Sequence, residues 1–253
     1  MSGACCGIAV MAKASRPGRT KTRLVPPLTP EEAAALNTAF LKDAFANIAA
    51  AALETGIRAF AAYGPIGEEA FFDCVAAQRP ELIPAVFPYF GDCLLAAIEG
   101  VLAAGCSAAC VLNSDTPDLP TKFLVACAWA LEDGRDRVVI GPADDGGYYL
   151  LGISRAHRRL FEDIDWSTPL VFGQTLVRAA ELKLEIVTLP VWSDIDDAAS
   201  LSRFVIGREN SGSKVAAQPF AAPHSSAHLE ASLREGDLGR RLAMPARLRV
   251  DAA

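Results

Sequence analysis

The sequence lacks three features that would each point to a common functional class. It has no surplus of positive charge: 24 lysines and arginines stand against 30 acids, and a net charge of -6 argues against general nucleic-acid or membrane-surface binding. It has no unbroken apolar run of membrane length, because the nearest one, residues 93–112, contains Glu99 and two glycines. No basic leader precedes its first apolar stretch, so we expect no signal peptide and a cytoplasmic protein.

Paired cysteine spacing is also missing. The seven cysteines are odd in number, lie mostly in apolar surroundings and form no CxxC motif. Cys106 and Cys110 are near neighbours, but no other ligand type accompanies them. This usage is typical of reduced core cysteines in a cytosolic protein, rather than of zinc ligands or disulfides.

What the sequence does contain is a regular alternation of apolar runs and helical segments over most of its 253 residues. The alternation predicts one α/β domain with a mostly parallel central sheet flanked by helices. We expect strands over residues 8–12, 57–63, 108–112, 138–142, 148–151 and 185–189, an edge strand within 83–90, and helices over 30–53, 68–77, 91–104, 121–131, 170–182 and 198–205. Thr29, Thr168 and Asp197 are the expected N-caps of three of these helices.

A strongly basic segment follows the first expected strand. Five cations, Lys13, Arg16, Arg19, Lys21 and Arg23, fall within eleven residues of an otherwise acidic protein. A proline and a glycine at 17–18 allow a tight turn, so lysine and arginine heads could converge on phosphate oxygens. The segment is neither a Walker loop nor a GxGxxG motif. We favour phosphate binding over a merely solvated basic loop.

The centre of the expected site is Asp115. The apolar run 108–112 breaks abruptly into Asn113, Ser114 and Asp115, and Pro117 then stiffens the turn. A carboxylate is therefore expected at the carboxyl end of a buried strand. In open α/β sheets that edge is where ligands bind.

Two adjacent glycines mark a second unusual stretch, Asp145-Gly146-Gly147-Tyr148. The pattern is typical of a hairpin turn, and such a turn could also place Asp145 and the glycine amides at the ligand crevice. Trp166 could stack on a ligand, although a tryptophan beside a helix start is as often simple packing.

Near the end of the alternating pattern, Asp194 and Asp196 point to the same side if the chain is extended. The pair fits either a cation site or a cluster capping the next helix. We favour the cation for Asp194 or Asp196 and the cap for Asp197. From residue 207 onward the sequence is linker-like, with one helix expected over 228–242.

Taken in order, these motifs resemble the DUF2064 family of GT-A-type transferases, also called selenodomain-associated transferase 1. The resemblance covers residues 7–205 and extends to the nucleotide-diphospho-sugar transferase superfamily, which includes the molybdenum-cofactor and 2-phospholactate nucleotidyltransferases. It implies a single Rossmann-like GT-A domain, to which we assign residues 1–206. The composition of residues 207–253, rather than the resemblance, indicates a C-terminal extension that is partly flexible.

The resemblance also implies roles for individual residues. The nucleotide would lie over Ala12, Lys13, Arg16, Gly18, Lys21, Arg23, Asn113 and Ser114, and the acceptor would meet Asp145, Gly146, Gly147, Tyr148 and Trp166. Mg²⁺ or Mn²⁺ would be held by Asp115 with Asp194 or Asp196, and Lys13, Lys21 and Asp115 would be catalytic. Two departures stand out: the basic segment lacks the Gx[ST]xRMGxxK pattern of the molybdenum enzymes, and Asn113 stands where a small glycine is expected.

The leading functional hypothesis is metal-dependent nucleotidyl transfer from an NTP to a small phosphorylated or phosphonylated acceptor, with release of pyrophosphate. The basic segment favours it, because a triphosphate needs more cations than a diphosphate. One alternative is a glycosyltransferase that uses a nucleotide-sugar donor, with Asp145 as base. Another is a non-catalytic nucleotide-binding protein. We expect no nucleic-acid or membrane partner, and a homodimer stays open.

Overall fold

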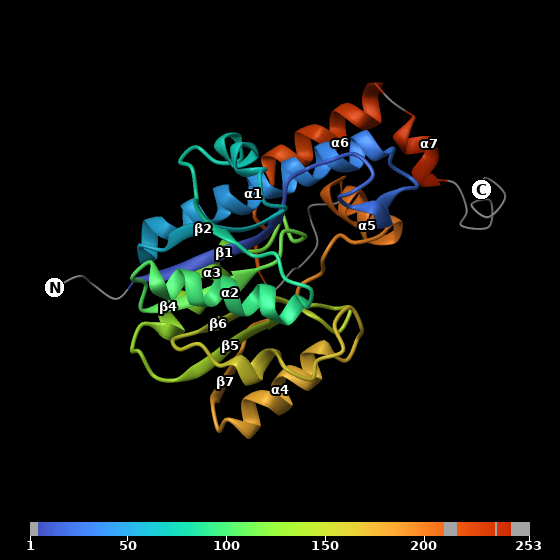
Figure 1. The fold of residues 1–253 in the computed structure, drawn as a ribbon. Coiled ribbons are helices and arrows are strands. Elements are labelled where there is room, and N and C mark those ends of the chain that lie inside the picture. The colour runs from blue at the N-terminus through green and yellow to red at the C-terminus, as the bar shows by residue number, and fades with distance from the viewer. Residues whose placement is uncertain (1–4, 210–216, 236, 244–253) are drawn as a thin grey trace.

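The fold is built on a central sheet of seven strands. The computed structural model describes residues 5–209, 217–235 and 237–243. In these residues the sheet has the order β3-β2-β1-β4-β6-β5-β7 (Figure 1). The strands are β1 (Cys6–Lys13), β2 (Arg58–Gly64), β3 (Glu81–Pro84), β4 (Ala108–Leu112), β5 (Arg137–Pro142), β6 (Tyr148–Ile153) and β7 (Glu185–Thr188). The fold class expected from the sequence is confirmed.

Strand β6 runs against its two neighbours, β4 and β5, while the other strand pairs of the described sheet are parallel. It follows β5 through the Asp-Gly turn, as the hairpin signal predicted. The ends of β1, β4, β5 and β7 therefore share one edge with the start of β6. The segments after these strands carry the expected site residues.

Helices cover both faces of the sheet, as alternation of side chains along the strands requires. Ile8, Val10 and Cys110 pack on one side against α1 and α3, while Ala9 and Val111 pack on the other side against α2 and α4. The helices are α1 (Pro30–Thr55), α2 (Phe90–Ala103), α3 (Thr121–Leu131), α4 (Val171–Glu181), α5 (Ala198–Glu209), α6 (Pro223–Glu235) and α7 (Leu238–Ala243), with short 3-10 turns η1 (Thr22–Leu24), η2 (Glu69–Cys74) and η3 (Arg158–Phe161).

Two of the three expected N-caps are present. Thr29 and Glu32 form a reciprocal capping box at the start of α1, with Pro30 as its first residue. Ser200 N donates to Asp197 Oδ1 at 2.7 Å before α5. The expected Thr168 cap is wrong: the N-cap of α4 is Leu170, and the Thr168 hydroxyl instead donates to Asp165 O. The chain bends once more after Pro169 before the helix begins, which the Thr-Pro signal did not reveal.

Three expected elements have different bounds. The helix expected over 68–77 is the shorter 3-10 turn η2, and the edge strand expected within 83–90 is β3, which ends before α2 begins. Pro84 and Pro88 explain this early end, because proline cannot donate to a strand ladder. The helix expected over 228–242 is two helices, α6 and α7. The linker-like residues 210–216 lie outside the described part of the chain.

A third cluster of buried side chains lies beyond the sheet, around the start of α1. It joins α1 to the 3-10 turn η1, to α5 and to the C-terminal helices; its buried members are Leu24, Leu28, Ala33, Leu36, Phe40, Ile195, Leu201, Phe204, Ala222, Leu229 and Leu238. In Figure 1, α6 runs alongside α1, and α5 lies close to the loop that precedes α1. No helix in the described residues is long and apolar enough to span a membrane.

Candidate nucleotide and metal site

The segment from the end of β1 to η1, residues 13–24, is called the basic loop below. Its start is fixed on α1, where Asn37 Nδ2 donates to Lys13 O at 3.1 Å and to Ser15 Oγ at 2.8 Å. Thr38 Oγ1 also donates to Ser15 Oγ at 2.8 Å. The polar residues on the buried face of α1 therefore hold the backbone at the carboxyl end of β1.

Lys21 is the most enclosed cation of the basic loop, with a side chain only 7% exposed. Its Nζ lies 2.6 Å from Asp115 Oδ1, 3.4 Å from Asp196 Oδ1 and 3.0 Å from Ile195 O. The ammonium also lies 5.1 Å from the centre of the Phe40 ring. Lys21 thus connects three segments that are far apart in the sequence.

Asp115 follows β4, as the sequence predicted, and is held as an anion. Burial raises the pKa of its carboxyl, but the Lys21 ammonium and the hydrogen bonds to the carboxylate together outweigh burial, so the pKa is lowered. Ser114 Oγ donates to Asp115 Oδ1 at 2.9 Å and adds to this effect.

Three further carboxylates converge beside this ion pair. Asp145, Asp194 and Asp196, called the acid cluster below, each offer an oxygen within 4.8 Å of the others. Burial and the neighbouring carboxylates raise the pKa of Asp194 to about 7 and that of Asp196 to about 6, although Lys21 opposes the second shift. The acid cluster therefore carries more negative charge than its protein neighbours balance.

The turn between β5 and β6 supplies Asp145. Gly147 N donates to Asp145 Oδ1 at 2.8 Å, which orients the carboxylate. Gly146 has φ of 91°, and a Cβ there would lie 2.3 Å from Pro169 O. Only glycine fits this close approach, and Phe172 N donates to Gly146 O at 2.9 Å, so the turn is joined to the start of α4.

The segment after β7 supplies the other two acids. Trp192 N donates to Pro142 O at 3.1 Å, and Ile195 N donates to Asp115 O at 2.9 Å. Ile195 itself points into the third core cluster. Because side chains alternate along extended chain, burial of Ile195 directs Asp194 and Asp196 to the opposite side, toward Asp145.

The remaining expected nucleotide-binding residues border this arrangement. Arg23, 72% exposed, lies 3.6 Å from Asp196 Oδ2, whereas Arg16 pairs with Glu68 on the segment after β2. Lys13 and Gly18 are exposed and Ala12 is buried. Asn113 accepts a hydrogen bond from Thr116 within the turn after β4.

The expected acceptor residues Tyr148 and Trp166 form an aromatic group beside the turn. Trp166 packs edge-on against Tyr148 and Phe90, with ring centres 6.5 and 5.2 Å apart. The Tyr148 hydroxyl is buried without a hydrogen-bond partner among the described residues, and burial raises its pKa. Trp166 therefore packs within this group, and its contact with the acceptor stays a prediction.

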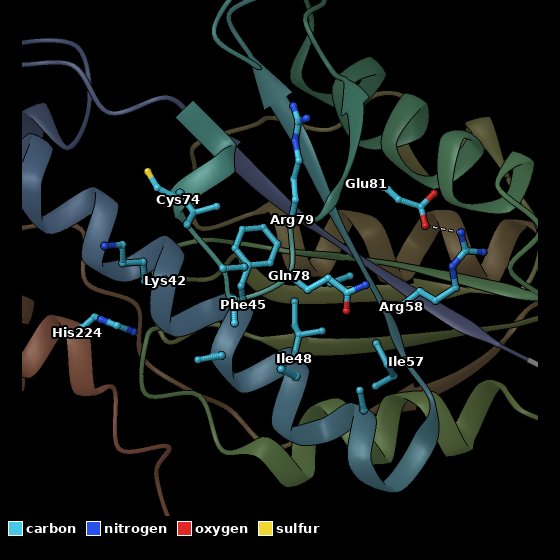
Figure 2. Close-up of a pocket in the computed structure, with 17 residues that line it drawn as sticks. Lys42, Phe45, Ile48, Ile57, Arg58, Cys74, Gln78, Arg79, Glu81 and His224 are labelled. Atoms are coloured by element: carbon cyan, nitrogen blue, oxygen red, sulfur yellow. Dashed lines mark hydrogen bonds and ion pairs between the residues drawn. The ribbon is translucent and has the colours of Figure 1, made fainter. Parts of the chain in front are cut away.

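Two cavities among the described residues differ in their relation to the expected site. The larger, about 850 Å³, lies between α1 and the segment leading to β3, and Figure 2 shows the apolar side chains of Phe45, Ile48 and Ile57 and the polar side chain of Gln78 in its lining. It includes none of the expected site residues. The smaller, about 410 Å³, includes Asp194 and lies between residues 191–195 and α5. Size alone does not identify the site here; the convergence of charge does.

Two features of the site were not anticipated from the sequence. Asp145 was expected to meet the acceptor, and the structure groups it with Asp194 and Asp196. Asp115 was expected to bind metal, and the structure pairs it with Lys21. The hydrogen bonds of Asn37 to the basic loop could have been suspected from the sequence, because a polar side chain on the buried face of an alanine-rich helix requires a hydrogen-bond partner.

Comparison with known proteins supports the fold and decides the family. The family described as "Uncharacterized protein conserved in bacteria (DUF2064)" matches residues 35–168, more than half of the chain. The chain belongs to the DUF2064 family. A search of the curated proteins found no match.

Among solved structures, the DUF2064 chain is similar to a candidate nucleotide-diphospho-sugar transferase from Desulfovibrio desulfuricans G20. The two are 24% identical, the alignment covers 95% of this chain and 99% of the other, and the TM-score is 0.77. It is also similar to a CMP:2-keto-3-deoxy-manno-octonic acid synthetase complexed with CTP, with 12% identity, 81% and 99% coverage and a TM-score of 0.51. At these identities the likeness shows a shared fold.

The matched range of the DUF2064 family contains Asp115 and Asp145 but neither the basic loop nor Asp194 and Asp196. The grouping of all these residues therefore comes from the structure itself.

Proposed function

We propose that the protein is a metal-dependent nucleotidyltransferase that joins the NMP part of an NTP to a small phosphorylated or phosphonylated acceptor. The observation that carries the proposal is the acid cluster, whose oxygens lie within 4.8 Å of one another, beside Lys21 and Arg23 of the basic loop. Carboxylates and cations gathered at one sheet edge suit a metal-bound polyphosphate.

The donor set fits Mg²⁺ or Mn²⁺, since carboxylate oxygens are the ligands that these hard cations prefer. Asp145, Asp194 and Asp196 would hold the ion, which would offset charge on the α-phosphate and the leaving pyrophosphate. Burial and then the neighbouring carboxylates raise the pKa values of Asp194 and Asp196, and a bound cation would offset the repulsion among these carboxylates. Asp115 would be a further ligand through Oδ2, because Lys21 and Ser114 both contact its Oδ1.

The protein's own contribution to the reaction is mainly electrostatic. An oxygen of the acceptor's phosphate attacks the α-phosphorus, the bond between that phosphorus and the bridging oxygen to the β-phosphate breaks, and pyrophosphate leaves with the electron pair. No general base is needed, because the attacking oxygen is already ionised. Lys13, Arg16, Lys21 and Arg23 would stabilise the phosphates, with Asn113 and Ser114 lining the nucleotide side of the crevice.

The glycosyl-transfer alternative is less well supported. It assigns Asp145 as a base toward an acceptor hydroxyl, whereas Asp145 lies with the two other acids and would be bound to the metal. A metal-bound carboxylate is a poor base, because the cation holds the lone pairs that a proton would need.

Ligand-dependent thermal stability tests the proposal. With Mn²⁺ present, at least one NTP should raise the melting temperature of the protein, because a ligand stabilises the folded state that it binds. Lys21→Ala should weaken NTP binding about 100-fold by calorimetry at 25 °C, whereas Arg19→Ala, a change in the same loop at an exposed cation, should weaken it less than threefold. Stabilisation by UDP- or GDP-sugars and not by any NTP would favour glycosyl transfer, and stabilisation by neither would reject both.

A further inference from the structure

The C-terminal helices share a core with the segments that carry the site. Leu229 of α6 and Leu238 of α7 belong to the same buried cluster as Leu24 and Leu28, which follow Lys21, and as Ile195, which separates Asp194 from Asp196. These five side chains are at most 3% exposed. The C-terminal helices therefore supply part of the hydrophobic core against which the residues after Lys21 pack.

Arg241 of α7 contacts the residues between η1 and the first turn of α1. Arg241 Nη1 donates to Pro27 O at 2.5 Å, and its two terminal nitrogens lie 2.8 and 2.7 Å from the two oxygens of Glu32. Such a two-point contact fixes both the position and the orientation of the guanidinium. Glu32 is also part of the capping box that starts α1, so Arg241 joins α7 to both the loop and the helix after it.

Two backbone hydrogen bonds connect Leu28, the residue after Pro27, with Lys21. Leu28 N donates to Leu24 O at 2.9 Å, and Leu24 N donates to Lys21 O at 2.9 Å. Lys21 has φ of 52°, a left-handed conformation that a non-glycine residue adopts only when its surroundings impose it. The contacts of Leu24 and Pro27 supply part of that constraint.

The C-terminal helices are in turn fixed to α1. Asp43 is fully buried and accepts hydrogen bonds from His224 N at 2.9 Å, from Ser225 N at 2.7 Å and from Ser225 Oγ. The Asp43 side chain therefore caps the start of α6 from another helix. This contact fixes the start of α6 on α1, and Leu229 of α6 and Leu238 of α7 pack in the same core cluster.

We propose that α6 and α7 form a positioning element for the nucleotide site and that Arg241 is its main positioning residue. By holding Pro27 and Glu32, Arg241 keeps residues 19–28 in the conformation that presents Lys21 to the acids and to a bound phosphate. The inference rests on the proposed function, in which Lys21 contacts the nucleotide's phosphates. Arg241 itself touches none of the expected site residues.

The test compares Arg241→Ala with Arg234→Ala in the full-length protein. Arg234 lies on α6, is 75% exposed and pairs only with Glu230 at 3.2 Å among the described acids, so it is the matched control. Two quantities are measured: amide hydrogen exchange of residues 19–28, and affinity for inorganic pyrophosphate in the presence of Mn²⁺. Affinity for Mn²⁺ alone is measured in parallel.

Arg241→Ala should speed exchange in residues 19–28 at least fivefold and weaken pyrophosphate binding about three- to tenfold, with Mn²⁺ affinity within twofold of the original. Arg241→Lys should recover part of the loss, because an ammonium can still reach Pro27 O or one oxygen of Glu32. Arg234→Ala should change neither quantity. This pattern separates local ordering of the loop from general stabilisation, which would speed exchange throughout the protein.

Three results would overturn the proposal. If Arg241→Ala left exchange in residues 19–28 unchanged, or raised it equally in the centre of α1, the helices would not act on the loop. If Arg241→Ala changed the exchange but bound pyrophosphate as tightly as the unaltered protein, the order of the loop would not matter for phosphate binding. If the unaltered protein bound neither pyrophosphate nor an NTP, the proposed function would fail, and the remaining exchange effect would be one of packing.

Discussion

Asp43 and the acid cluster differ in how the fold balances their negative charge. Asp43 is fully buried, yet two backbone amides and a hydroxyl donate to it, so its charge is matched by donors that the fold supplies. Among the described residues, the acid cluster has cations beside one member, Asp196, where Lys21 and Arg23 lie, and Asp145 accepts one hydrogen bond from Gly147 N, so its charge is matched only in part. A buried acid with its donors in place stabilises structure, whereas crowded acids that lack them indicate a site that completes itself with a cation.

The sharpest test of this contrast uses two adjacent aspartates. Asp145 belongs to the acid cluster, while Asp144 accepts a hydrogen bond from Ser193 Oγ at 2.6 Å and lies outside it. Asp145→Asn should weaken Mn²⁺ binding about 100-fold, or about 2.7 kcal/mol, because the ion loses one of three anionic ligands. Asp144→Asn should change it less than twofold. Calorimetric titration of Mn²⁺ at pH 8 measures both, and equal affinities for the two variants would remove Asp145 from the metal site.

The structural carboxylate should respond in the opposite manner. Asp43→Ala should lower the free energy of unfolding by about 2 kcal/mol, because three donors at the start of α6 lose their acceptor inside the protein. Asp73→Ala, which removes an exposed acid paired with Arg79, should change it by less than about 0.5 kcal/mol. Urea unfolding measures both values. A loss at Asp43 no larger than that at Asp73 would mean that water replaces the carboxylate without penalty.

The smallest expected effect is on the pH dependence of the metal-free protein. The folded pKa values of Asp194 and Asp196, about 7 and about 6, lie above the value of about 4 in an unfolded chain, so the folded state binds more protons between these limits. The free energy of unfolding should therefore rise as the pH falls from 8 to 6, by about 1 kcal/mol after allowance for partial solvent exposure. Asp194→Asn should flatten this dependence. With saturating Mn²⁺ the slope should reverse, since the ion binds the ionised carboxylates, and unfolding curves at several pH values with and without Mn²⁺ would show whether it does.

Much of the fold follows from local signals in the sequence. The capping box at Thr29, the turn at Asp145-Gly146 and the polar break after Leu112 each depend on residues adjacent in the chain, and all three are present as predicted. The same locality explains the error at Thr168: a threonine-proline pair indicates a helix start, but the exact start depends on how Gly146 meets Pro169, a contact between distant segments.

The sequence predicted which residues gather at the site, but not which of them contact one another. That Lys21, Asp115, Asp194 and Asp196 gather at one sheet edge follows from the positions of the strands that precede them. The packing of three loops decides which acid pairs with Lys21 and which acids contact one another. The spacing of residues in the sequence does not predict these contacts. The capping of α6 by Asp43 was likewise hidden, because its partners lie 181 and 182 residues away.

The hydrogen bonds of the segment after β7 make its length matter more than its composition. The backbone N–H groups of Leu189, Trp192 and Ile195 each donate to a neighbouring segment. These hydrogen bonds fix which side of the chain faces the acid cluster. Adding or deleting one residue here would turn Asp194 and Asp196 inward and bring Ile195 out. Homologous chains that share this chemistry should therefore keep the two acids and the number of residues between Leu189 and Ile195, while the exposed residues between them vary.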